Sequence, residues 1–528
     1  MLYRDVVYWF GPFTPYLHAG FFAVFGSSFG TLTLAGIVGS AAALAALFAC
    51  TSLVAGRRAA FLWTAIAIPL LVFMRYSGGG ILGMGYRMWH AAAFALAACA
   101  VAFSRRPSAA RAAGAGALVG MAGLCRADWG LLAAAALAAG LALAGPGARD
   151  AARRIAIVVA TAAAVFALGM LPFVAAAGLS AFRTESFALL VGLPAQTRAS
   201  ALAWTGADRW PWGVWSWIYA TAFWLCAFWM VEAAALRWSD PGALRRRLPA
   251  LLAGGAVLAI GAFVGFPAGS LSLSWVPVVC VLAIVRALRE GRRDGLLLAA
   301  ALIGLLGSAR RIFDLRDFGY VAPPVLFALV CAAALVRASI RRRGPDARRR
   351  LGWAVEAALA TTAAAFFALR LVQYAADPRV PIPGTGGWLT ASAARAAELD
   401  ALARRIRERT PAGSALVVFP DAAVVNFLAG RENPLRHKLY VAGYLGPDNE
   451  AQVVDELEHE APAAIAIVDR PDGQLPNRVF GEDYGGAVRR WIEARYDLAP
   501  VVKRPADPAG SPALLGFPRT AAAPPPGP

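Results

Sequence analysis

The sequence predicts a polytopic α-helical membrane protein with a C-terminal α/β domain outside the membrane, and three observations lead to this fold class. First, 59% of the 528 residues are hydrophobic and 16% are charged, whereas soluble domains are about 45–50% apolar and about 25% charged. Second, apolar runs with almost no charge recur between Phe29 and Leu371, and about 20 such residues span a bilayer core. Third, composition and charge change abruptly after Gln373.

The apolar runs divide into about twelve candidate spans. Several are short or rich in alanine and glycine, and the run 110–125 is the weakest of them. Together they would carry the chain across the bilayer from residue 29 to residue 372. The candidate spans are 29–54, 59–74, 82–103, 110–125, 129–144, 155–178, 212–236, 250–267, 271–287, 295–309, 320–338 and 352–372.

The charged loops support both the number of spans and one orientation. If each segment crosses once, six basic loops fall on the same side, and short loops rich in arginine mark the cytoplasmic face. The N-terminus, the alternate loops and everything after Gln373 then face outward. The six basic loops are Arg57–Arg58, Arg105–Arg111, Arg149–Arg154, Arg237–Arg247, Arg286–Asp294 and Arg337–Arg350.

The net charge of +19 does not indicate a nucleic-acid-binding protein, because it is concentrated in these loops. Residues 1–372 hold 34 basic and 13 acidic side chains, whereas residues 373–528 hold 17 and 19. The surplus is therefore an orientation signal at the bilayer surface. We expect a lipid bilayer as partner and no nucleic acid.

This topology places the first residue outside with no preceding helix to carry it across. A further helix upstream would remove that difficulty and bring the complete protein to thirteen spans. We therefore expect Met1 to be an internal methionine; the alternative is a short N-terminal tail that crosses unaided.

The expected domain organisation has four parts. Residues 1–28 form an outer loop with a surface helix over Pro15–Phe25, and residues 29–372 form the membrane body. Residues 373–520 alternate helical with strand-like patterns, typical of a small α/β domain: helices at 391–410, 422–429, 449–460 and 486–496, and strands at 415–419 and 463–468. The proline-rich tail 521–528 is expected to be disordered. All six cysteines lie in the membrane half, where we expect them to pack as small apolar residues.

The first segment carries the candidate catalytic residue. Arg4, Asp5 and two prolines exclude a membrane span, and its many aromatic rings suit the membrane interface. Asp5 is therefore a carboxylate held where a lipid headgroup would lie. The alternative is an ordinary interfacial acid paired with Arg4.

This segment resembles the first external loop of the GT-C glycosyltransferases, including protein O-mannosyltransferases and lipid A aminoarabinose transferases. The resemblance rests on the outer Asp5, the aromatic stretch after it, the turn Gly11-Pro12-Phe13-Thr14-Pro15-Tyr16 and a surface helix ending in Phe25-Gly26. The layout of spans followed by an outer domain is also similar. The segment Phe427–Pro434 looks like the outer domain of bacterial members.

The resemblance implies a membrane enzyme that takes a sugar from a polyprenyl-phosphate donor and passes it to an envelope lipid, glycan or protein. It assigns Asp5 as the base that deprotonates the acceptor hydroxyl. We expect a bacterial inner membrane and a periplasmic C-terminal domain. A transporter or flippase of lipid-linked glycans remains an alternative, as does a non-catalytic scaffold; the former should show internal repeats and charges near the bilayer midplane, which the spans lack.

The leaving phosphate needs positive charge, and several residues at outer helix ends are candidates to bind it. Arg87 and His90 lie three residues apart and hence on one helix face; the alternative for Arg87 is snorkelling to the interface. The candidates for donor phosphate are Arg87, His90, Arg126, Arg310, Arg311 and Arg316.

Further candidates for the acceptor side are Arg4, His18, Asp128, Arg183 and Glu185. His18 has a packing role as its alternative, and Asp128 has an ion pair with Arg126. Some family members carry a basic residue where this chain has Gly11-Pro12, so phosphate contacts must come from elsewhere. With one acid in the loop and no cluster of His, Asp or Glu nearby, we expect no cofactor and no tightly bound metal; a divalent ion stays possible in principle but unsupported.

Overall fold

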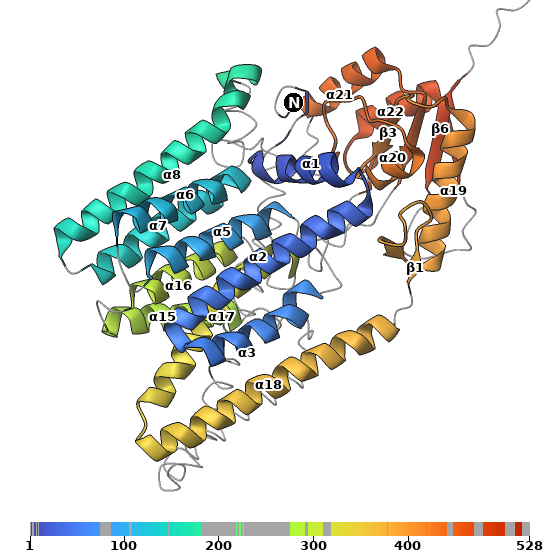
Figure 1. Ribbon diagram of the computed structural model, residues 1–528. Helices are drawn as coiled ribbons and strands as arrows, with labels where there is room; N and C mark the ends of the chain where they lie inside the picture. The colour runs from blue at the N-terminus through green and yellow to red at the C-terminus, as the bar shows by residue number, and fades with distance from the viewer. Residues whose placement is uncertain are drawn as a thin grey trace, which may run out of the picture.

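A computed structural model describes most of the chain and shows a helical bundle joined to a small α/β domain (Figure 1). The described residues are 2, 5–6, 8, 10–73, 86–104, 108–145, 147–180, 275–290, 294–309, 318–376, 379–421, 423–440, 447–468, 479–501 and 513–519, with isolated positions at 218, 221–222 and 225.

The bundle helices match every predicted span except 212–236 and 250–267, which lie almost entirely outside the described residues. Within those residues, five helices are long and apolar enough to cross a membrane: α2, α7, α8, α17 and α18. The bundle elements are α1 (Phe13–Phe25), α2 (Phe29–Ala55), α3 (Arg57–Ala67), the π-helix η1 (Ile68–Val72), α5 (Arg87–Ala102), α6 (Ala109–Cys125), α7 (Ala127–Ala144), α8 (Ala148–Ala177), α15 (Trp275–Glu290), α16 (Gly295–Ser308), α17 (Phe318–Arg341) and α18 (Pro345–Ala376).

The predicted span 59–74 is not one regular helix. α3 gives way at Ile68 to the π-helix η1, and Pro69 accounts for the change because proline lacks the N–H that a continuous α-helix requires. Pro69 O accepts a hydrogen bond from Arg370 Nε of α18 at 2.8 Å.

The weakly apolar helix α6 lies inside the bundle, where small residues let helices approach closely. A Cβ at Gly120 would come within 2.8 Å of Ala162 O on α8, and one at Gly116 within 2.9 Å of Thr161 Cβ. This four-residue spacing of glycines is typical of helix contacts in membranes. The alanine- and glycine-rich composition that made the run 110–125 the weakest predicted span therefore reflects close packing of α6 against α8. The five described cysteines are likewise buried and free, as expected of small packing residues.

Successive helices run in opposite directions, so the bundle has two ends (Figure 1). At the end that we call the basic end, α2, α5, α7, α15 and α17 finish and α3, α6, α8, α16 and α18 begin. The predicted basic loops Arg57–Arg58, Arg149–Arg154 and Arg337–Arg350 lie here, as do the described parts of Arg105–Arg111 and Arg286–Asp294, whereas Arg237–Arg247 lies outside the described residues. At the other end, which we call the domain end, lie α1, the first residues and the C-terminal domain. The described helix ends are consistent with this two-sided arrangement, whereas most of the predicted outer loops lie outside the described residues.

The C-terminal domain is a four-stranded mixed sheet in the order β3-β4-β6-β5, covered on both faces. β3 and β4 are parallel, and the β4–β6 and β6–β5 pairs are antiparallel. Its elements are β1 (Val380–Pro381), β2 (Thr390–Ala391), α19 (Ala393–Arg409), β3 (Leu416–Phe419), α20 (Ala423–Ala429), α21 (Pro447–Glu460), β4 (Ala464–Ile467), α22 (Gly486–Arg495), β5 (Tyr496–Pro500) and β6 (Leu514–Pro518).

Alternation along β3 separates the two cores of the domain. Leu416 and Val418 pack with α19 and α20, whereas Val417 and Phe419 pack with α21 and α22. Successive residues of a strand point to opposite faces of the sheet. Because helices cover both faces, all four of these side chains are buried. The predicted helices and the strands at 415–419 and 463–468 are present. Strands β5 and β6 are an addition that the sequence pattern did not predict.

The domain sits on the N-terminal end of α2. The rings of Phe29 and Phe427 are 4.7 Å apart, edge to face, and a Cβ at Gly30 would lie 2.8 Å from Trp388 Nε1. The motif Phe427–Pro434 also has an internal role: buried Arg431 donates to Thr410 O at 2.6 Å and to Ala429 O at 3.1 Å. The domain therefore meets the bundle beside α1.

Candidate functional site

The N-terminal loop is anchored over the ends of α6 and α8. Leu2 and Tyr8 pack against a buried apolar cluster of Leu124, Met170 and Phe173. Asp5 lies in the turn between the bridged residues Leu2 and Val6, and its side chain is exposed. The loop thus holds a carboxylate at the domain end, open to solvent and flanked by residues fixed to the bundle.

Gly11 and Pro12 are both buried beneath this loop. A Cβ on Gly11 would overlap the backbone carbonyl of Leu124 in the last turn of α6. The loop is therefore pressed onto α6 at this point. Any side chain at this position would therefore have no room without a shift of the backbone.

Arg87, the first residue of α5, contacts an aromatic ring of the N-terminal loop. Its guanidinium carbon lies 3.3 Å from the centroid of the Phe10 ring and 4.2 Å from that of Tyr86. The Arg126 guanidinium carbon lies 5.2 Å from the same Phe10 ring. A guanidinium over a ring face gains cation–π attraction. Phe10 thus contacts both Arg87 and Arg126, two of the predicted phosphate-binding residues.

Tyr8 lies close to the same arginine. Burial raises the pKa of the Tyr8 hydroxyl above its usual value, although the charge of Arg87 and a hydrogen bond with it act in the opposite direction. Tyr8 therefore remains a neutral phenol at physiological pH and can serve Arg87 as a hydrogen-bonding neighbour.

Arg126 and Asp128 form a bidentate ion pair at the turn between α6 and α7. Arg126 Nε donates to Asp128 Oδ1 and Arg126 Nη2 to Asp128 Oδ2, both at 3.0 Å. The side chain of Arg126 is 1% exposed and that of Asp128 is 25% exposed. The structural alternative for both residues, that they pair with one another, is therefore what the geometry favours. Arg126 has fewer donors left for a ligand than Arg87 has.

His90 lies one turn after Arg87 on α5 and contacts α1. Its Nδ1 is 3.0 Å from Thr14 Oγ1 in a buried hydrogen bond. The His18 ring packs against it edge to face with centroids 6.0 Å apart, and the Phe13 ring does so at 6.3 Å. The predicted surface helix is thus pinned to α5 by Thr14, Phe13 and His18.

Arg87 Nε and His90 Nε2 are buried polar atoms without a hydrogen-bond partner in the described part of the chain. Such an atom costs free energy unless something binds it. Arg87 and His90 lie three residues apart on one face of α5, Arg87 against Phe10 and His90 against α1. An arginine N–H and an imidazole nitrogen are suitable groups for binding phosphate oxygens.

The structure brings together part of the predicted site only. Asp5, His18, Arg87, His90, Arg126 and Asp128 all belong to the domain end. Arg4, Arg183, Glu185, Arg310, Arg311 and Arg316 lie outside the described residues. No group of three His, Cys, Asp or Glu side chains in the described ranges is placed to hold a metal ion.

Sequence reasoning missed Thr14, Phe10 and Tyr8. Each acts through a contact with α5 that is distant in sequence, so no local spacing indicates it. The aromatic richness of residues 3–16 is the one signal, and it predicts an interface belt without indicating which ring will support an arginine.

No protein-family model matches this chain, and no curated protein matches it. Solved structures do match. An oligosaccharyltransferase from Archaeoglobus fulgidus, solved in complex with Zn and sulfate, is 17% identical with a TM-score of 0.50; the match covers 88% of this chain and 60% of that one. ArnT from Cupriavidus metallidurans, bound to undecaprenyl phosphate, is 12% identical with a TM-score of 0.46; the match covers 96% of this chain and 87% of that one.

Both of these proteins are GT-C glycosyltransferases. The likeness to the oligosaccharyltransferase confirms at the level of fold the resemblance expected from the sequence, and the chain spans about 60% of the length of that protein. The protein therefore shares the fold of that oligosaccharyltransferase over the matched part.

Proposed function

We propose that this protein is a membrane glycosyltransferase that moves one sugar from a polyprenyl-phosphate donor to an envelope lipid, glycan or protein. The observation that carries the proposal is the presence of three groups at the domain end of the bundle. These are the exposed carboxylate of Asp5, Arg87 on the Phe10 ring, and the buried His90.

In the proposed reaction the acceptor hydroxyl oxygen attacks the anomeric carbon of the donor sugar. The bond between that carbon and the phosphate oxygen breaks, and the polyprenyl phosphate leaves with the electron pair. Asp5 takes the acceptor proton, which general-base catalysis requires. Direct displacement of this kind inverts the configuration at the anomeric carbon.

The leaving phosphate accumulates negative charge, and donors fixed in advance stabilise such charge most effectively. Arg87 suits this task because aromatic rings hold its face while its Nε keeps no partner among the described residues. His90 suits it because Thr14 fixes the ring through Nδ1, with Nε2 unused. Arg126 adds positive charge beside Phe10, although Asp128 neutralises much of it.

The proposed location is a bacterial inner membrane, with the domain end facing the periplasm. The concentration of arginines at the basic end supports this orientation, because arginine-rich short loops stay in the cytoplasm. The C-terminal domain would then lie beside α1 and the Asp5 loop. We propose that it contributes to acceptor binding, as its contacts at Phe29 and Gly30 bring it to this end of the bundle.

The test is a mass-spectrometric comparison of envelope glycans, glycolipids and glycoproteins. The strains are the parent, the deletion, and the deletion carrying wild-type, Asp5→Asn or Asp346→Asn protein at equal membrane abundance. Asp346 is an exposed acid at the opposite end of the bundle and serves as the matched control. We expect one sugar to disappear on deletion and to return with wild type and Asp346→Asn, but not with Asp5→Asn.

The lost mass then identifies the sugar class. If Asp5→Asn restores the glycan as fully as wild type, the assignment of the base is wrong. A transporter or a scaffold then becomes the better reading, and accumulation of an unflipped lipid-linked glycan in the deletion strain distinguishes the former.

A further inference from the structure

A polar cavity lies at the basic end, opposite the candidate active site. Its volume is about 420 Å³, and seven helices contribute to its walls. Four arginines and one aspartate line it, which leaves a surplus of three positive charges. The arginines are Arg154, Arg286, Arg337 and Arg341, and the acid is Asp294.

Three of the arginines are fixed in place by carbonyl groups of neighbouring helices. Arg154 Nη2 donates to Ala102 O at 2.9 Å, and Arg337 Nη1 donates to Val54 O at 3.2 Å. Arg286 Nη1 donates to Ala334 O at 3.4 Å. A guanidinium has five N–H donors, so each of these bonds orients the group and leaves further donors for a ligand.

The acids nearby do not use all of those donors. Glu290 accepts from Arg286 Nη2 at 2.7 Å, and Asp294 Oδ2 is 3.7 Å from Arg286 Nε. That separation is too long for a hydrogen bond. Arg154 Nε, Arg286 Nε and Asp294 Oδ2 accordingly remain buried with no hydrogen-bond partner in the described ranges.

The cavity also has an apolar side. Leu296 and Leu297 form part of its wall, and the exposed side chain of Leu53 stands at its edge. A basic pocket between membrane helices with an apolar border fits an anionic headgroup attached to acyl chains. The same donors would also accept a free phosphate ion.

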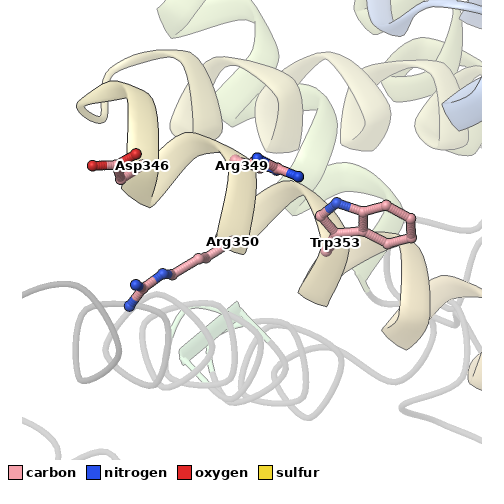
Figure 2. Close-up of a pocket in the computed structure, with 4 residues that line it drawn as sticks. All are labelled: Asp346, Arg349, Arg350 and Trp353. Carbon is pink, nitrogen blue, oxygen red and sulfur yellow. The ribbon is translucent and has the colours of Figure 1, made fainter.

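A neighbouring hollow lacks these properties. Figure 2 shows Asp346, Arg349, Arg350 and Trp353 along the first turns of α18. All four come from a single helix, and Trp353 is 64% exposed. Arginine and tryptophan in this arrangement are typical of a helix entering the membrane interface. Arg350 therefore offers a matched control at the same end of the bundle.

We infer that the cavity framed by Arg154, Arg286 and Arg337 is a binding site for a phosphate group, separate from the candidate glycosyltransferase site. The group would belong to an anionic phospholipid headgroup or to a free phosphate ion. The inference depends on the arginine geometry at the basic end alone and stands whatever reaction the domain end performs.

The experiment measures lipid retention by native mass spectrometry on the purified, delipidated full chain. The probes are phosphatidylglycerol and phosphatidylcholine added in detergent, with inorganic phosphate as the third arm. Wild type is compared with Arg154→Gln, Arg286→Gln and the control Arg350→Gln. Melting temperature without added lipid checks that each variant is folded, and Arg154→Lys serves as a gentler change at that position.

We expect wild type to prefer phosphatidylglycerol to phosphatidylcholine, and either cavity variant to weaken that preference at least tenfold while Arg350→Gln leaves it intact. If millimolar inorganic phosphate alone raises the melting temperature of wild type but not of the cavity variants, the site exists and its ligand is free phosphate. Equal retention of both lipids with no effect of phosphate would overturn the inference. So would a loss in Arg350→Gln as large as in Arg286→Gln, because the effect would then be diffuse charge.

Discussion

The two ends of the bundle use the same residue type in different ways. At the domain end, aromatic rings support the face of Arg87 and leave its in-plane Nε without a partner among the described residues. At the basic end, Arg154 and Arg337 each give an N–H to a helix-end carbonyl. The comparison teaches that the role of an arginine in a membrane protein depends on which of its donors are already used, rather than on its position alone.

The largest expected effect comes from removing Arg87. Arg87→Ala should lower kcat/KM for sugar transfer by about 10²–10³-fold, the cost of losing one fixed donor to developing negative charge. The kcat/KM of Arg87→Lys should lie between those of wild type and Arg87→Ala, since lysine supplies a point charge without the planar set of donors of arginine. Transfer assays on purified protein at equal abundance measure both.

Arg57, exposed at the basic end, is the matched control, and Arg57→Ala should retain full activity. If Arg87→Ala and Arg57→Ala behave alike, the contrast between the two ends has no catalytic meaning.

The next effect concerns stability. Asp128→Ala leaves Arg126 buried without its carboxylate and should lower the free energy of unfolding by about 3 kcal/mol. Replacing both residues of the ion pair by apolar ones, as in the double variant Arg126→Met with Asp128→Leu, should restore most of the lost stability. Unfolding in detergent, followed by circular dichroism, measures the difference in the free energy of unfolding. If Asp128→Ala is as stable as wild type, the ion pair does not stabilise the α6–α7 turn.

A smaller effect is expected at Gly11. Gly11→Ala forces a methyl group onto the Leu124 carbonyl and should lift the loop that carries Asp5. Because small displacements of a reacting group are costly, transfer should fall about tenfold while the bundle remains folded. Gly20→Ala is the control, since a Cβ there meets nothing within 4 Å.

The smallest effect lies in the C-terminal domain. Burial raises the pKa of Glu456, but hydrogen bonds and the charge of His437 outweigh it and hold that pKa below its usual value. A carboxyl group with a lowered folded-state pKa stabilises the fold above its unfolded pKa, about 4.3. That contribution disappears as pH falls through the folded-state pKa.

Glu456→Gln should therefore lower stability at pH 7 by less than about 1 kcal/mol and flatten the decline in acid. Melting temperatures of wild type and variant between pH 7 and pH 3 test this. A variant whose acid decline is as steep as that of wild type would contradict it.

The sequence predicted the bundle well because apolar length and loop charge are direct consequences of the bilayer. Helices α2, α7 and α8 end within a few residues of the predicted limits at one or both ends. The π-helix at Pro69 was not predicted, although proline gave a local reason for it. In the domain, β5 and β6 were missed since Asp497 and Pro500 in one, and Gly516 in the other, disfavour strands.

The candidate site was predictable as a list but not as an arrangement. The spacing of Arg87 and His90 indicates one helix face, and the structure agrees. That Thr14 would bond to His90, or that Phe10 would lie under Arg87, depends on how α1 and the loop settle on α5. Such tertiary contacts have no signature in spacing. The six candidates outside the described residues remain predictions.

The helix α18 has a further consequence for the position of the C-terminal domain. It runs as one helix of 32 residues from the basic end to Ala376, about 48 Å at 1.5 Å per residue, and β1 begins at Val380. The helix thus acts as a rigid connector whose length is set by its number of residues. One residue inserted within it would rotate the domain by about 100° and separate Phe427 from Phe29. The number of residues in α18 therefore determines the orientation of the domain.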